Sequence, residues 1–321
     1  LDTIHIWYIL PIHKTIVMDK FLTTASKEDP SPPSFIDVLK KRNPHKRDKF
    51  LQFEEKWHKY TITNDTKSKY MSVTKWNHSH FPSFNADLII RKMMAGKNWN
   101  EDNKYWGMTP TQIKKLWNDN GATASKAGTK LHLDIECFMN QYLVDEDDKL
   151  VATDHEMLID SYNEDKHEGD CAISNDTVEW DYFMRFVAEE CRDKTPYRTE
   201  WMVYDEDLKL AGSVDMVYQN EDGTLDIYDW KRAKDISYAN NFGDTATTAC
   251  IAHVDNTNYW HYSLQLNTYK HILESKYGKT VRNLRLVVLH PDAVCNNYEV
   301  IDCADMSSEI DSLMNLRRTM L

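Results

Sequence analysis

The sequence predicts an α+β fold, α/β in the broad sense, with helices in the front half, then a strand meander, then a helix and a strand that complete the sheet. Segments 208–218 and 224–231 alternate apolar and polar residues with a period of two, as strands do. Segments 121–143 and 259–276 carry apolar residues at helical spacing. With 321 residues, 41% of them apolar, the chain can bury a substantial core.

Residues 1–69 are expected to form a flexible basic extension to a single domain at 70–321. Most of the extension is polar and shows no period, and residues 40–49 carry a basic run. We expect one short helix at 50–60. The extension could be a solvated linker or an arm that contacts nucleic acid, and residues 1–17 could lie upstream of the natural start.

Two helices are predicted next. Thr109, Pro110 and Gln112 have the order of a capping box, and this helix is expected to end near Gly121. The second helix follows over 121–143, and its apolar stripe is expected to pack in the core.

A strongly acidic stretch begins after the second helix. It predicts an exposed loop over residues 145–181. A further helix is expected over 178–191, with Asp176 as its N-cap and Trp180 on its buried face.

The strands are expected at 199–204, 208–218 and 224–231. A turn signal at 220–223, Asn-Glu-Asp-Gly, joins the last two as a hairpin.

The last part of the chain is expected to return to the sheet. Residues 233–258 could form a lid over the cleft. The helix at 259–276 is stopped by Gly278, and a buried strand at 284–289 and a terminal helix at 308–317 follow.

Asp215, Asp229 and Lys231 carry the strongest chemical signal. Side chains alternate along a strand, so Asp229 and Lys231 point to the same side, with Asp215 on the neighbouring strand. Two carboxylates and an amine on a sheet surface suit a hard divalent cation and an activated water. Taken alone, a short motif of this kind is more often an ion pair or a solvated edge residue.

His132 and Glu136 lie four residues apart and therefore share a face of the helix at 121–143. His132 could be a half-buried core residue. Beside a carboxylate it could instead be a metal ligand, because neutral imidazole binds Mn²⁺-like ions.

The sequence leaves open whether three further residues belong to the site. Gln265 and Tyr269 lie one turn apart on the helix at 259–276, and could be boundary residues or part of the site. Glu200, in the strand at 199–204, could support the lysine or the metal, or could be a surface charge.

The order His132, Glu200, Asp215, Asp229-x-Lys231 and Gln265-x-x-x-Tyr269 resembles the RecB-like branch of the PD-(D/E)XK nuclease superfamily, which includes the mitochondrial genome maintenance exonuclease and viral relatives. The resemblance spans about residues 70–290. It implies a restriction-endonuclease-like core, with a central mixed β-sheet flanked by helices, and metal-dependent cleavage of DNA. Val214 stands where the superfamily has its eponymous proline.

The resemblance also implies roles for single residues. His132, Asp215 and Asp229 would bind one or two Mg²⁺ or Mn²⁺ ions, with the carbonyl of Trp230 as a further ligand. Lys231 would position or polarise the attacking water. The full set of catalytic candidates is Lys231, Asp215, Asp229, Gln265, Tyr269 and Glu200.

DNA is the expected partner, as a single strand, and protein partners cannot be named. Gln265 and Tyr269 would hold the lysine and the nucleic acid, and Arg232 and Lys234 form a basic cluster beside Lys231. The net charge of −12 argues against strong nonspecific binding to a polyanion, although local charge matters more than the sum. Some tryptophans could stack on the bases of a single strand, although tryptophan is more often a core residue. The candidates are Trp76, Trp99, Trp106, Trp230 and Trp260.

The six cysteines include no close Cys-x-x-Cys pair, so we expect no iron–sulfur cluster, although several relatives have one. Scattered cysteines suit a reducing intracellular compartment, whether cytoplasm, nucleus, mitochondrion or a viral replication site. The apolar start of the chain has no basic leader and no cleavage site, so secretion is not expected. No stretch approaches the roughly 20 apolar residues of a membrane span.

The function expected from these observations is that of a DNA exonuclease acting on single-stranded ends in replication, repair or recombination. A structure-selective or RNA-directed endonuclease with the same metal site is one alternative. A catalytically inactive nucleic-acid-binding protein is the other.

Overall fold

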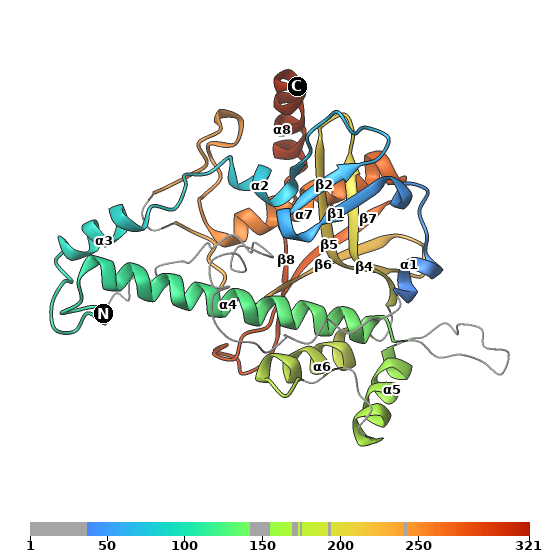
Figure 1. Ribbon diagram of the computed structural model, residues 1–321, viewed down its shortest axis with the longest axis horizontal. Helices are drawn as coiled ribbons and strands as arrows, with labels where there is room; N and C mark the ends of the chain where they lie inside the picture. Colours follow the sequence, from blue (N-terminus) through green and yellow to red (C-terminus); the bar gives the residue numbers. More distant parts are fainter. Residues whose placement is uncertain (1–36, 142–154, 169–172, 174, 192–193, 241–242) are drawn as a thin grey trace.

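A computed structural model describes residues 37–141, 155–168, 173, 175–191, 194–240 and 243–321 (Figure 1). Within these ranges the protein is a mixed α/β structure with eight α-helices and a six-stranded mixed sheet. The acidic residues 145–148 and the first 36 residues lie outside the described part of the chain.

The sheet is built around one long strand, β5. Its strands are β3 (Met71–Ser72), β4 (Thr195–Asp205), β5 (Leu210–Gln219), β6 (Leu225–Lys231), β7 (Val281–Val288) and β8 (Glu299–Asp302). The order is β3-β5-β6-β7-β8, and β4 pairs with β5. The β4–β5, β5–β6 and β7–β8 pairs are antiparallel, whereas β6–β7 and β3–β5 are parallel.

The predicted hairpin is confirmed. Met216 pairs with Tyr228 and Gln219 with Leu225, and Gly223 closes the turn with a φ of 82° that a side chain would disfavour. The strand expected at 199–204 is the longer β4, and the strand expected at 284–289 is β7.

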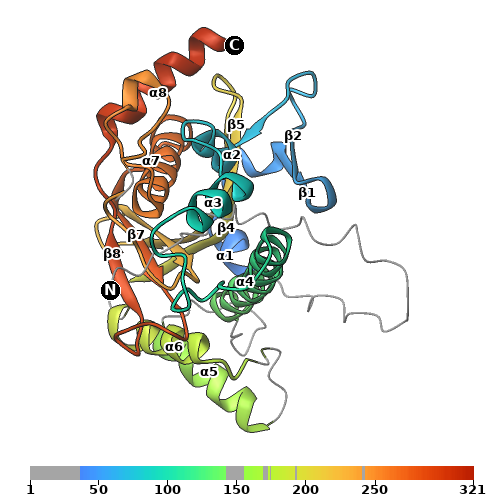
Figure 2. The same cartoon turned by 90° about the vertical axis from the view of Figure 1, so that its left-hand side faces the viewer.

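Helices cover both faces of the sheet. Figure 2 shows the strands lying between α7 (Asn258–Tyr277) on one side and α4 (Pro110–Met139), α5 (His155–Glu168) and α6 (Val178–Glu190) on the other. Each face has its own apolar core. One core packs Phe138 of α4 and Phe183 of α6 against Trp230, and the other packs Leu266 of α7 against Ile227.

Two predictions about the helices are wrong. The first helix does not end at Gly121: α4 runs for 30 residues from its Thr109 capping box through that glycine. One glycine costs a helix interior only about 1 kcal/mol, and packing of the flanking turns offsets this. The N-cap of α6 is Thr177, whose hydroxyl accepts from the backbone of Trp180, rather than Asp176.

A helix also replaces part of the predicted acidic loop. In α5 the residues His155, Leu158 and Tyr162 are buried at helical spacing. The Trp180 indole of α6 donates a 3.0 Å hydrogen bond to the Tyr162 hydroxyl, which ties the two helices together.

The short helix expected at 50–60 is instead a hairpin of β1 (Leu51–Glu54) and β2 (Lys59–Ile62). Its apolar residues alternate, and Leu51, Tyr60 and Ile62 are buried. A 3₁₀ turn at Glu55–Trp57 joins the two strands.

Residues 37–69, assigned from sequence to a flexible extension, pack against the domain. Leu39 of α1 (Val38–Arg42) is buried in a core, and its backbone N–H donates to the Asn140 side chain at 3.1 Å. Arg198 of β4 binds Asp48 at 2.9 Å, within the short 3₁₀ helix Asp48–Phe50. This segment is therefore part of the folded body.

The remaining helices complete the body. They are α2 (Val73–His78), α3 (Ala86–Met94) and α8 (Ser307–Met320), with a 3₁₀ turn at Ala249–Ile251. As predicted, Gly278 ends α7, with a φ of 61°. Among the described residues, no helix has both the length and the apolar character needed to cross a membrane.

Candidate metal centre

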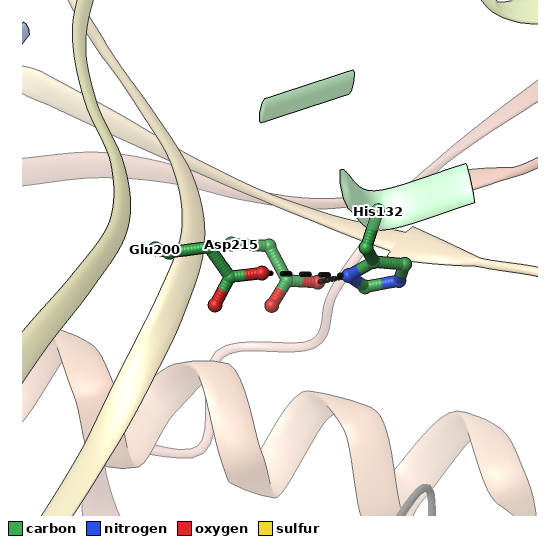
Figure 3. Close-up of side chains that lie close together, drawn as sticks. All are labelled: His132, Glu200 and Asp215. Carbon is green, nitrogen blue, oxygen red and sulfur yellow. Dashed lines mark ion pairs between the residues drawn. The ribbon is translucent and has the colours of Figure 1, made fainter. Parts of the chain in front are cut away.

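Three ligand-type side chains meet on the sheet, from one helix and two strands. The Nδ1 atom of His132 on α4 lies 3.5 Å from Oδ2 of Asp215 on β5 and 3.7 Å from Oε1 of Glu200 on β4 (Figure 3). The ligand atoms of the three residues lie within 4.8 Å of one another. They form a possible metal-binding triad.

The register of β4 and β5 brings the two acids together. Thr199 pairs with Met216 and Trp201 with Val214, which places Glu200 opposite Asp215 on the same face of the sheet. Glu200 has a φ of 41°, a left-handed conformation that is uncommon in a strand for a residue with a side chain. The Ser213 hydroxyl donates to Glu200 Oε2 at 2.8 Å and holds this carboxylate in place.

The edge of β5 opposite β4 pairs with two different strands, one before Asp215 and one after it, and we call it the divided edge. On this edge β3 pairs with Leu210 and Ala211, whereas β6 pairs from Met216 onward. The backbone N–H of Trp230 therefore has no ladder partner on β5, and it donates to Oδ2 of Asp215 at 3.2 Å. At the divided edge, the Asp215 carboxylate thus takes the place of a ladder partner for β6.

The other backbone group of Trp230 orients the histidine. Nε2 of His132 lies 3.1 Å from the Trp230 carbonyl, which can only accept, so Nε2 carries the proton. The lone pair of Nδ1 then faces the two carboxylates, where it is available to a cation that they also bind. Histidines that bind metals commonly donate their second ring nitrogen to a backbone carbonyl in this way.

This donor set fits a hard divalent cation. Carboxylate oxygens suit Mg²⁺ and Mn²⁺, and imidazole is acceptable to Mn²⁺ in particular. The electrostatics agree, because burial raises the pKa of Asp215 to about 7, and the neighbouring Asp229 and Glu200 carboxylates contribute to the rise. Crowded acids of this kind are stabilised in their charged form by a cation.

Asp229 and Lys231 form a buried ion pair beside the triad. The Lys231 ammonium contacts Asp229 Oδ2 and lies 4.5 Å from the centre of the Tyr262 ring. Burial alone would lower the pKa of Lys231, but the carboxylates of Asp229 and Asp215 raise it above its usual value. Asp229 lies outside the group of three, so its predicted role as a metal ligand stays a prediction.

Gln265 and Tyr269 reach the same region from α7. Tyr269 is buried, and its hydroxyl is hydrogen-bonded to Gln265. A Cβ atom at Gly212 would lie only 2.7 Å from this hydroxyl, so β5 needs glycine here for the ring to approach. The ring rests on β5 three residues before Asp215.

The two further basic candidates have acidic partners. Arg232 Nε donates to Glu179 of α6 at 2.6 Å, and both side chains are largely buried. Lys234 is exposed and lies 3.7 Å from Asp292. Their predicted contacts with substrate stay predictions, as does the role of the Trp230 carbonyl as a metal ligand.

The sequence offered two acids as possible companions of His132: Glu136, which shares its helix, and Glu200, which could support the lysine or the metal. Glu136, one helical turn away, is outside the triad, and the neighbour that matters is Glu200 on a different element. The strand register explains why Glu200 lies next to Asp215. Asp205 pairs with Leu210, and five steps outward along each strand lead to Glu200 and Asp215.

Two contacts had no sequence signal. The hydrogen bond from Ser213 and the contact of Tyr262 with the lysine depend on neighbours brought together only by folding. No protein-family model matches this chain, and no curated protein sequence matches it.

Proposed function

We propose that this protein is a metal-dependent nuclease with a PD-(D/E)XK-like core, which hydrolyses phosphodiester bonds in DNA. The observation that carries the proposal is the placement of the His132–Glu200–Asp215 triad beside the Asp229–Lys231 pair, at the divided edge of β5. Acids on two adjacent strands, with a lysine two residues after the second acid, are the arrangement that the sequence resemblance implies.

Different residues would bind the metal ion and stabilise the charge of the phosphate. His132, Glu200 and Asp215 would hold the ion, with Asp229 as a further candidate ligand. A bound Mg²⁺ or Mn²⁺ ion would lower the pKa of a coordinated water and stabilise charge on the phosphoryl oxygens. Lys231 keeps its proton, because its pKa is raised, so it supplies positive charge beside the phosphate and does not act as a base.

Aromatic and polar residues from α7 hold Lys231 and its surroundings in position. Tyr262 contacts its ammonium, and the Tyr269 hydroxyl, bonded to Gln265, lies where β5 approaches α7. A site held by buried contacts on strands and a helix is pre-organised, which limits the rearrangement needed during cleavage.

We infer an exonuclease on single-stranded DNA ends, acting inside the cell in replication, repair or recombination. This finer assignment is based on the sequence resemblance. An endonuclease on structured DNA or on RNA would use the same metal site.

A cleavage assay separates these functions. The purified protein is incubated with end-labelled linear single-stranded DNA, circular single-stranded DNA and RNA, each with Mg²⁺, Mn²⁺ or EDTA. The proposal expects metal-dependent loss of the linear DNA only. Cleavage of the circle indicates an endonuclease, and cleavage of RNA indicates the RNA-directed alternative.

Variants link the activity to this site. Asp215→Ala should abolish cleavage, whereas Glu221→Ala, at an exposed acid in the turn of the same hairpin, should not. Unchanged activity in Asp215→Ala, or no cleavage of any substrate by the wild type with either metal, refutes the proposal.

A further inference from the structure

A shallow pocket lies at the far end of α4 from the metal centre. It has a volume of about 440 Å³, and its walls include the indoles of Trp99 and Trp106 and the side chains of Met94 and Met108. Pro110, also in its wall, is 22 residues from His132 on one continuous helix. At about 1.5 Å per residue, the pocket is about 33 Å from the triad, so it is separate from the metal centre.

The pocket belongs to a helical arm, which we define as residues 86–117. Figure 1 shows α3 and the first turns of α4 projecting from the sheet at the left of the view. The arm has its own apolar cluster, in which Ile90, Tyr105 and Ile113 are buried. It can therefore present the pocket as a rigid surface rather than as a loose loop.

One of the two indoles, that of Trp106, is open to solvent, whereas Trp99 is half-buried against the apolar cluster of the arm. Trp106 is 48% exposed, and its ring centre lies 5.6 Å from that of Trp99 with the ring planes tilted at 58°. The thioether side chains of Met94 and Met108 adapt readily to a flat ring. These walls suit a planar aromatic group of a ligand.

The charge of the arm indicates which kind of ligand would supply the planar aromatic group. The arm has six basic and three acidic residues, although the chain as a whole has a net charge of −12. Lys97 and Lys104 are exposed, and each is two residues from a pocket tryptophan. Aromatic platforms with adjacent lysines are typical of surfaces that stack the bases of a single strand and neutralise its phosphates.

We propose that this pocket binds an unpaired base of the single-stranded nucleic acid whose end is cleaved at the metal centre. This inference rests on the proposed function for its choice of substrate. A strand seated in the pocket would extend along α4 towards His132. At the 3.4 Å spacing of stacked bases, this distance corresponds to about ten nucleotides.

Binding measured without cleavage tests the inference. The Kd of a fluorescently labelled 30-nucleotide single strand is measured in EDTA by anisotropy, and a blunt 30-base-pair duplex is measured in parallel. Trp106→Ala should weaken single-strand binding about 5- to 100-fold and leave duplex binding unchanged. Trp106→Phe, which keeps an aromatic face, should bind nearly as the wild type does.

Trp57→Ala is the matched control. Trp57 is 62% exposed in the β1–β2 hairpin turn, outside the arm, and its removal should leave the Kd unchanged. Equal losses in Trp57→Ala and Trp106→Ala, or an equal loss for the duplex, overturn the inference. So does wild-type affinity in Trp106→Ala.

A second variant keeps the test valid if Trp106→Ala does not fold. The double variant Lys97→Glu/Lys104→Glu changes two exposed side chains and should reduce the salt dependence of single-strand binding by more than one unit of log Kd per log salt. An unchanged slope overturns the inference. If these variants weaken binding but the wild type cleaves nothing, the pocket assignment holds and the nuclease assignment fails.

Discussion

Oδ2 of Asp215 accepts the backbone N–H of Trp230 at 3.2 Å, and this one hydrogen bond joins the two strands of the site where their ladder has ended. The same residue, Trp230, accepts from His132 through its carbonyl. Trp230 therefore positions two members of the triad through its backbone while its side chain is buried in the core.

Asp215→Asn should separate metal binding from folding. The amide oxygen can still accept from Trp230, but one charge leaves a crowded group of acids, so stability in EDTA should not fall. Mn²⁺ at 100 times its Kd should add about 2.7 kcal/mol to the free energy of unfolding of the wild type and so raise its Tm. It should not do so for the variant. Thermal melts with Mn²⁺ or EDTA measure both effects. A Mn²⁺-dependent rise in Asp215→Asn equal to that of wild type contradicts the assignment.

Lys231→Met should reduce both activity and stability. The loss of its charge should lower the cleavage rate about 100- to 1,000-fold. Asp229 would also remain buried without its ion-pair partner, at a cost of about 3 kcal/mol or more.

The double variant Asp229→Asn/Lys231→Met distinguishes the two effects. It should recover most of the stability in urea unfolding but none of the activity. Lys59→Met, at an exposed lysine on β2 outside the candidate site, is the control and should change neither strongly. Recovery of activity in the double variant would show that the charges are structural only.

Gly212→Ala should disturb Tyr269 and reduce cleavage. The new Cβ would lie within 3 Å of the Tyr269 ring, and such overpacking costs about 1–3 kcal/mol. Gly128→Ala is the control: nothing lies within 4 Å of a Cβ there, and alanine should stabilise α4 by about 0.5–1 kcal/mol. Urea unfolding and cleavage rates check both, and equal behaviour of the two variants contradicts the close approach.

Acid should destabilise the protein through buried His261. Burial lowers its pKa to about 3, with the neighbouring His78 contributing, against an ordinary value of 6.5. Between these values the unfolded chain binds a proton that the folded chain does not, so stability present above pH 6.5 is lost as the pH falls. The loss is about 1.4 kcal/mol per pH unit.

His261→Gln should remove this dependence. Comparing the two proteins by urea unfolding in EDTA between pH 4 and 7 cancels the groups that they share. The variant should lose less stability than the wild type on acidification. Parallel curves would mean that His261 titrates normally in the folded state.

Local sequence patterns predicted the elements that carry the candidate site. Alternation along 208–218 and 224–231 predicted the hairpin and placed Asp229 and Lys231 on one side, because side-chain direction in a strand has a period of two. The glycine at 278 predicted the end of α7, because glycine readily adopts the left-handed conformation found there. These features depend on neighbours in the chain.

Features that depend on competition between local preference and packing were predicted less well. The glycine at 121 and the polar segment at 50–60 suggested a helix end and a helix. The structure has a continuous α4 and a strand hairpin, because burial of apolar residues outweighs propensities of about 1 kcal/mol or less.

By itself, the sequence determined which side chains are candidates for the site and which of them share a strand or a helix. Only the tertiary structure decided that Glu200, rather than Glu136, joins His132 and Asp215. Periodicity specifies directions within one element, whereas a three-residue site needs the crossing of α4 over two strands. That crossing is set by the packing of the apolar core, which no local pattern contains.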